Sequence, residues 1–87
     1  MELYDKAIRL GASDFGVSHR KGKRFYVVYG YKTIHFGSKN GQTYYDHKDN
    51  TIRNAWKARH SKIINNDGIP FYTIKESPEY WSWHLLW

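Results

Sequence analysis

Two runs of β-branched and aromatic residues occupy the middle of the chain. Residues 24–29 (RFYVVY) are rich in such residues, and residues 32–36 (KTIHF) alternate polar with apolar side chains. Both compositions are typical of strands, and Gly30 lies between the two runs. The pattern therefore predicts a β-hairpin that turns near Gly30. The turn pair Asn40-Gly41 ends the hairpin, and residues 42–45 are predicted to form a third short strand.

The segment after this turn has helical spacing. Asp49 or Thr51 is placed to cap a helix that runs to about Ile63. At about 100° per residue, Ile52, Trp56 and Ile63 fall within one narrow stripe. The spacing predicts an amphipathic helix that packs this stripe against the hairpin.

Shorter helices are predicted near both ends of the chain. Residues 2–10 place apolar side chains at roughly helical spacing, and Gly11 is suited to end that helix. Ser77 and Pro78 form a helix start, and the residues that follow include three tryptophans. The elements together predict an α+β fold. A small antiparallel β-sheet of two to three strands packs with a central amphipathic helix and a short C-terminal helix.

Composition limits the class of protein. The 87 residues fit one small domain, and 18% of them are aromatic, which disordered chains are not. The chain has no cysteine for a disulfide, a thiolate metal site or a nucleophile. No apolar run approaches the ~20 residues of a membrane span, and residues 1–10 lack the apolar core of a secretory leader. We expect a soluble, intracellular protein that needs no cofactor.

The formal net charge of +6 is concentrated in the centre of the chain. Residues 20–62 contain eleven Lys or Arg against Asp46 and Asp49, a net charge of +9, while both flanks are slightly acidic. Such a segment suits an acidic partner, either a protein surface or a nucleic acid, although a solvated surface that serves solubility is the alternative. The candidate basic face consists of Arg20, Lys21, Lys23, Arg24, Lys32, Lys39, Lys48, Arg53, Lys57 and Lys62.

Aromatic residues offer a second candidate surface. The Trp-rich end is predicted to dock on the sheet or on a partner, because disordered ends rarely have this composition. Tyrosines of the strands, set among basic residues, would suit the stacking of bases, unless they belong to the core. The candidate interface aromatics are Tyr80, Trp81, Trp83 and Trp87.

Arg59 falls inside the apolar stripe of the central helix, whereas Arg53 and Lys57 fall on a flank that is predicted to face solvent. An arginine in an apolar stripe requires a partner, so a structural clamp is predicted between Arg59 and an acidic side chain. A phosphate-binding fork is the alternative. The five histidines have no close ligand spacing, and no metal site is predicted. Candidate partners of Arg59 are Asp46, Asp49 and Glu79.

Four short motifs carry a family resemblance. They are the strand end KTIHFG at residues 32–37, the step HKD at residues 47–49, the helix end RH at residues 59–60 and the terminal LLW at residues 85–87. As a set, they resemble a largely uncharacterised family of small basic proteins encoded by large DNA viruses of algae and protists. The resemblance covers residues 23–87, which we take as one α+β domain, and leaves residues 1–22 as an N-terminal extension. It implies a viral setting rather than a mechanism.

Three functions are compatible with these features. The first is a minor capsid or virion component that binds larger viral structural proteins through the basic face and the Trp-rich end. The resemblance places such a protein in the virion and the host-cell cytoplasm. The second is a module that binds DNA or RNA and packages a genome. The first is preferred because no convincing catalytic set is present and because a small core gains stability from assembly.

The third function is a nuclease. The hairpin loosely resembles that of GIY-YIG nucleases, which use two tyrosines, an arginine and a later glutamate that binds metal. Tyr26 and Gly37 match this pattern, His35 stands where the second tyrosine belongs, and Arg53 and Glu79 are stand-ins. The departures leave this resemblance weak, so no catalytic residue is assigned.

Overall fold

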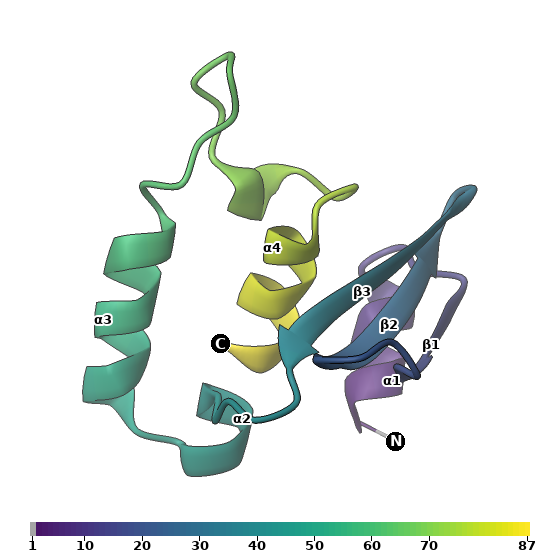
Figure 1. Cartoon of the computed structure of the whole chain (residues 1–87), viewed down its shortest axis with the longest axis horizontal. Helices are drawn as coiled ribbons and strands as arrows, with labels where there is room; N and C mark the ends of the chain where they lie inside the picture. The colour runs from purple at the N-terminus through teal and green to yellow at the C-terminus, as the bar shows by residue number, and fades with distance from the viewer. Residues whose placement is uncertain (1) are drawn as a thin grey trace.

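The computed structural model describes residues 2–87, which form a three-stranded sheet with helices on one side (Figure 1). The predicted α+β class is confirmed. In chain order the elements are α1 (Glu2–Arg9), β1 (Asp14–Val17), β2 (Lys23–Tyr29), β3 (Lys32–Ser38), α2 (Tyr44–His47), α3 (Asn50–His60), the 3₁₀ turn η1 (Phe71–Thr73), α4 (Pro78–Trp81) and the π-helical η2 (Ser82–Leu86).

The sheet is antiparallel throughout, in the order β1-β2-β3. The hairpin is confirmed, since β2 and β3 pair up to Tyr29 and Lys32 across a two-residue turn. The third strand was predicted at the wrong place: it is β1, and residues 42–45 instead lead into α2. Thr43 and Asp46 form a capping box there, so this polar stretch starts a helix rather than a strand.

The core lies on the inner face of the sheet. Phe15, Phe25 and Phe36 come from the three strands, and their ring centroids are 5.2–6.5 Å apart. Leu3 of α1 is also buried, and Trp81 of α4 is 0% exposed. Residues 2–22 therefore supply a strand and a helix to the same core as residues 23–87. The boundary predicted at residue 22 does not separate two packing units.

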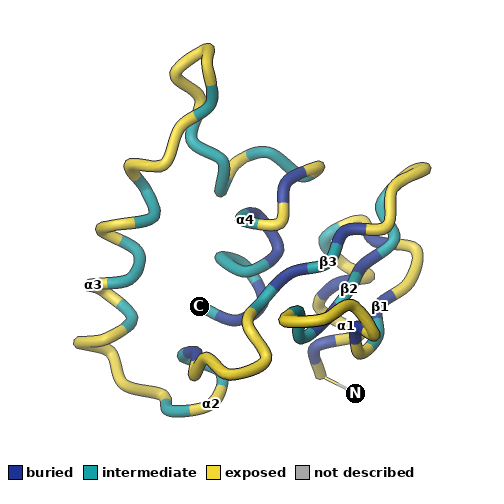
Figure 2. The backbone as a smooth tube through the Cα atoms, in the orientation of Figure 1, coloured by how far each residue is buried: buried dark blue, intermediate teal, exposed yellow. Residues whose placement is uncertain are grey.

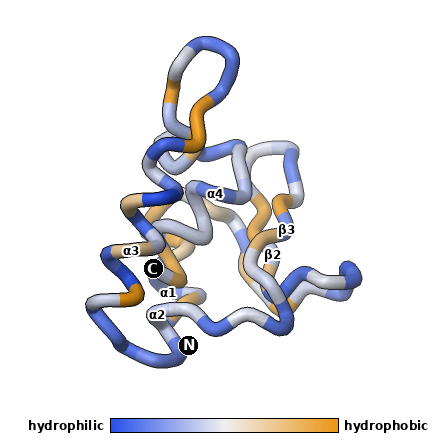
Figure 3. The backbone as a smooth tube through the Cα atoms, turned by 60° about the vertical axis from the view of Figure 1, so that its left-hand side comes forward, coloured by the Kyte–Doolittle hydropathy of each residue, from blue (hydrophilic) through white to orange (hydrophobic). Residues whose placement is uncertain are grey.

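The C-terminal segment docks on β3, as predicted. Ser77 caps α4 by accepting a hydrogen bond from the Tyr80 amide, and Pro78 occupies the first turn. The Trp81 indole donates a hydrogen bond of 2.7 Å to the Lys75 carbonyl, so its polar atom is satisfied inside the core. Hydrophobic residues of β2 and β3 lie beside α4, while the tip of the loop after α3 is hydrophilic (Figure 3).

Helix α3 is the least buried long element. None of its residues is buried, and it stands apart from the sheet (Figures 1 and 2). Of the two predicted cap candidates, Asp49 and Thr51, Asp49 caps the helix, which ends at His60 rather than near Ile63. Of the predicted apolar stripe, Trp56 packs against the rest of the molecule, whereas Ile52 stays exposed and Ile63 lies exposed beyond the end of the helix.

Candidate interaction cleft

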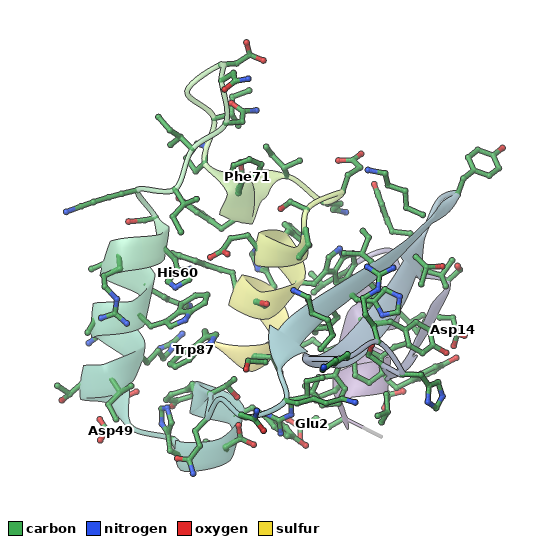
Figure 4. The ribbon with its side chains drawn as sticks, viewed as in Figure 1. Glu2, Asp14, Asp49, His60, Phe71 and Trp87 are labelled. Atoms are coloured by element: carbon green, nitrogen blue, oxygen red, sulfur yellow. The ribbon has the colours of Figure 1, made fainter. Side chains whose placement is uncertain are left out.

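A cleft of about 560 Å³ separates α3 from the rest of the molecule. One wall is α3, which contributes Trp56, Arg59 and His60, and the opposite wall includes Lys23 and Phe36. The C-terminal residues close its base. Figure 4 shows His60 and Trp87 in the space between α3 and the C-terminal helix. A single connected hollow therefore contains aromatic, cationic and apolar side chains.

Stacked rings attach α3 to the C-terminal segment. The Trp56 ring stacks on Trp87 with a centroid distance of 4.6 Å and on His60 with a distance of 3.8 Å. Trp83 stacks on Tyr72 at 4.0 Å. Such pairs add about 0.5–1.5 kcal/mol beyond their buried area, and of these three stacks the Trp56–Trp87 pair is the one that joins α3 to the C-terminal segment.

Two polar contacts reinforce this attachment. The imidazole Nδ1 of His60 lies 2.5 Å from the Glu79 carboxylate, and both side chains are only partly exposed. The Arg53 guanidinium donates a hydrogen bond of 2.7 Å from Nε to the Trp87 carbonyl. Both contacts join α3 to the C-terminal segment, so α3 is positioned at three separate points along its length.

The predicted clamp around Arg59 is wrong. Arg59 is exposed, and among residues 2–87 it forms no ion pair. Asp46 instead accepts two hydrogen bonds of 2.6 Å from Arg24, an i,i+22 pair that joins β2 to α2. Asp49 caps α3 through the amides of Thr51 and Ile52. Arg59 does line the cleft beside Trp56, but its side chain is exposed, so water solvates the guanidinium and no acidic partner is required.

The Asp46 carboxylate is strongly held in its charged form. The hydrogen bonds from Arg24 hold the pKa of Asp46 well below its usual range, against the opposing effect of desolvation. The amide and hydroxyl of Thr43 also donate to Asp46, at 2.8 and 2.9 Å. This carboxylate thus fixes the segment that leads from β3 into α3.

The ten residues of the predicted basic face do not form one face. Arg53 and Lys57 were predicted to face solvent, but both are half-buried, because their cationic ends lie over the rings of Tyr44 and Trp83. Burial, followed by the charge of Arg53, lowers the pKa of Lys57. Four of the ten cations therefore have contacts within the molecule. Arg24, Arg53 and Lys57 have internal partners, and Lys48 lies over the rings of Tyr44 and Tyr45.

The remaining basic residues lie mainly in turns. The turn before β2 and the turn after β3 are adjacent, since the Lys39 amide donates to the Gly22 carbonyl at 3.3 Å. Four cations lie in these turns or at the adjoining start of β2, and we call them the basic turns: Arg20, Lys21, Lys23 and Lys39. Lys23 also lines the cleft. Lys32 starts β3 at the far end of the hairpin, and Lys62 follows α3.

The predicted interface aromatics divide into two pairs. Tyr80 and Trp81 are buried in the core, so they are not accessible to a partner. Trp83 and Trp87 are half-buried and belong to the stacked rings, and Trp87 lines the cleft. The four aromatic residues differ in exposure because one face of the C-terminal segment docks on β3. The spacing of these residues in the sequence does not reveal which face contacts the sheet.

Sequence reasoning did not identify several cleft residues. Phe36 and Leu86 look like ordinary core residues in the sequence, and both are buried residues that also line the cleft. The pairing of His60 with Glu79 spans nineteen positions and had no sequence signal. Lys23, Arg59, Glu79 and Trp87, by contrast, were among the residues singled out from the sequence, and all four line the cleft.

The residues of the nuclease resemblance lie in separate places. Tyr26 and His35 face each other across the hairpin, with ring centroids 6.2 Å apart. Arg53 bonds to the Trp87 carbonyl, and Glu79 pairs with His60 in the cleft. Over residues 2–87, no three His, Asp or Glu side chains are grouped as a metal site requires. Over the same residues, none of the helices has the length and apolar character to cross a bilayer.

Comparison with known proteins gives a family but no activity. Residues 13–60, from just before β1 to the end of α3, match the model of a family of unknown function (DUF5754). The chain is also similar to "Uncharacterized protein L851" of Acanthamoeba polyphaga mimivirus. The two are 35% identical over 75 residues, which cover 80% of this chain and 75% of the relative. No solved structure matches the chain. The match to the family model and the similarity to a viral protein together establish that the chain belongs to the DUF5754 family of unknown function.

Proposed function

We propose that this chain is a viral interaction protein, a minor capsid or virion component that binds a segment of a larger viral structural protein in the cleft beside α3. The mimivirus relative supports a viral setting. The observation that carries the proposal is the cleft itself, in which apolar and aromatic side chains lie below a cationic rim. Buried apolar anchors surrounded by polar groups are typical of protein-binding sites.

The charges of the cleft indicate the chemistry of the partner. Lys23 and Arg59 line opposite walls, and neither has an ion-pair partner among residues 2–87. The carboxylate of Glu79 also lines the cleft, but it is bonded to His60. A segment with acidic residues flanking an apolar side chain would bind both rim cations and cover the apolar base.

Nucleic acid is the second candidate partner, and the basic turns favour it. Four cations in and beside two adjacent turns would suit a phosphate backbone. Base stacking, however, needs free aromatic faces, and in this molecule Trp56 already stacks on two rings and Trp83 lies between Tyr72 and Lys57. We therefore prefer a protein partner. Affinity for an oligonucleotide that falls steeply between low and physiological salt would favour nucleic acid instead.

We propose no enzymatic role. The separate positions of Tyr26, Arg53 and Glu79 argue against a shared nuclease centre. A plasmid-nicking assay with added divalent metal ion tests this statement. Nicking by the chain that disappears in Glu79→Gln would contradict it.

The proposal is tested by reversing one rim charge. Arg59→Glu should reduce the amount of the chain in purified virus particles several-fold, because the cleft would then repel an acidic segment. Arg9→Glu is the matched control, since Arg9 is exposed on α1 and does not line the cleft. We expect the control to remain in particles at the normal level, and both variants to remain folded by circular dichroism. Equal incorporation of both variants, or absence of the chain from particles, would contradict the proposed function.

A further inference from the structure

We propose that the partner segment adds a fourth strand to the sheet, along the outer edge of β3. This inference rests on the proposed function and specifies how the partner binds. It follows from three observations: the open edge of β3, the groove beside it, and the charge around that groove.

The outer edge of β3 has unpaired backbone groups. β3 is the last strand of the sheet and pairs only with β2. In an antiparallel pair, alternate residues direct their N–H and C=O groups away from the partner strand. Since Tyr29 and Lys32 close the two-residue turn as a bonded pair, the outward groups belong to Thr33, His35 and Gly37. Within residues 2–87, no backbone hydrogen bond joins these three residues to another element.

A groove of about 290 Å³ runs beside this edge. Thr33 and His35 line it from β3, and Glu76 and Pro78 line it from the segment before and at the start of α4. Lys23 and Pro78 line both this groove and the cleft, so the two hollows are adjacent. An extended segment in the groove would therefore carry its next residues toward the cleft beside α3.

The charge around the groove selects the occupant. Three cations, Arg20, Lys23 and Lys32, line it, against the single carboxylate of Glu76. Desolvation, followed by the positive charges of Arg20 and Lys23, lowers the pKa of His35. A second copy of this chain would bring like charges together at this edge, a common device against edge-to-edge pairing. An extended segment with acidic side chains at alternate positions has the complementary charge.

Backbone pairing makes a prediction that simple charge attraction does not. The probe is a capped peptide of about ten residues that alternates glutamate with valine. In NMR titrations at millimolar peptide, the amide signals of Thr33, His35 and Gly37 should shift and their hydrogen exchange should slow. The inward amides of Ile34 and Phe36, which already bond β2, should change little.

Two N-methylated versions of the peptide provide the control. Each carries methyl groups on one alternate set of amides, so only one version blocks the hydrogen bonds to β3. We expect that version to lose about tenfold or more in affinity, and the other to keep its affinity. Equal affinity of the two versions, or no shift at the three outward amides, would overturn strand addition. NMR shifts confined to Trp56 and Arg59 would also overturn strand addition, but they would be consistent with binding of the peptide in the cleft.

A single-stranded oligonucleotide of similar length separates the other class of partner. If it shifts the three outward amides and the peptide does not, the edge binds nucleic acid and strand addition is wrong. The proposed function is tested separately, by the amount of the Arg59→Glu variant in virus particles. Normal incorporation of that variant would contradict the proposed function without testing strand addition.

Discussion

At the scale of single residues, Asp46 determines how the chain passes from the sheet to α3. Its carboxylate accepts hydrogen bonds from Arg24 of β2 and from the amide of Thr43, which begins the capping box of α2. The bidentate pair is partly exposed, with 24% and 27% of the two side chains accessible. Solvent weakens such a pair, but the capping bonds add to it.

Replacing Asp46 by Asn should lower the free energy of unfolding by about 1 kcal/mol at neutral pH. The pKa of Asp46 is lower in the folded chain than its unfolded value near 3.8. The stabilisation is therefore complete above about pH 4 and is lost as the pH falls toward the lower, folded-state pKa. Urea denaturation of both proteins at several pH values measures this difference.

Asp67→Asn is the matched control, because Asp67 is exposed in the loop after α3 and takes part in neither the Arg24–Asp46 nor the His60–Glu79 pair. It should leave the free energy of unfolding within about 0.5 kcal/mol of the parent value. A loss in Asp46→Asn that stays constant down to pH 2 would show that the charge of Asp46 is not the cause.

Local signals in the sequence identified some single residues correctly. Ser77 was predicted as a cap and Asp49 as one of two candidates, and the side chain of each accepts hydrogen bonding from the first turn of its helix. A cap depends only on its neighbours in the chain. The partner of Asp46 lies 22 positions away, so nothing in the local pattern could choose Arg24 over Arg59.

At the scale of elements, the end of β3 depends on Gly37. Its φ is +78°, and an added Cβ would lie 3.1 Å from Leu86 and 3.2 Å from the Cβ of Arg24. Gly22, with a φ of +79°, has open space around the same position. Both glycines have a positive φ, but only Gly37 is crowded. Substitutions at the two positions therefore distinguish the cost of backbone strain from the cost of crowding.

Gly22→Ala should cost about 1 kcal/mol from the positive φ alone. Gly37→Ala should cost about 1–3 kcal/mol more, because the C-terminal segment must move away from β3 as well. Thermal or urea denaturation measures both. Equal losses in the two variants would contradict the close packing of Leu86 against the strand.

Helix α3 should be the first long element to open. It has no buried residue and is held by the Trp56 ring stack, the contacts of Arg53 and His60, and its cap at Asp49. Asp49→Ala should destabilise it by about 1 kcal/mol. Amide hydrogen exchange should then speed up in α3 severalfold while the amides of β2 exchange at their former rate.

The matched control is Asn50→Ala, because Asn50 is an exposed residue in the same turn whose side chain makes no capping contact. It should leave the exchange of α3 nearly unchanged. Faster exchange throughout the sheet in Asp49→Ala would mean that α3 and the sheet open together, and the independent opening of α3 would then be wrong.

Element types were predictable where the pattern has a clear period. The hairpin is confirmed because its β-branched and aromatic runs flank a glycine. β1 was missed, since four residues that include Gly16 carry little strand signal. The inner face of α3 was predicted only in part. Trp56 of the predicted stripe packs against the molecule, but Ile52 and Ile63 stay exposed, and cations placed over rings supply the other contacts.

At the scale of the whole molecule, the fold distributes the net charge of +6 unevenly. Arg24, Arg53 and Lys57 are used to hold the fold together, and the basic turns and Arg59 remain at or near the cleft. The excess of cations in the centre of the chain is evident from the sequence, but the single basic face predicted from it is not formed. The sequence could not predict the cleft, because the walls come from segments that are distant in sequence and meet only in the folded molecule.

Site-specific photocrosslinking from the cleft tests the central claim most directly. Ile52 is exposed and lines the cleft, so a photoreactive phenylalanine analogue there should form a covalent adduct with a larger protein in virus particles. The same group at Ile8, exposed on α1 and outside the cleft, is the control and should give no such adduct. An adduct of one defined larger protein from position 52 alone is the result that we predict. Adducts only with nucleic acid, or the same products from both positions, would contradict a protein-binding cleft.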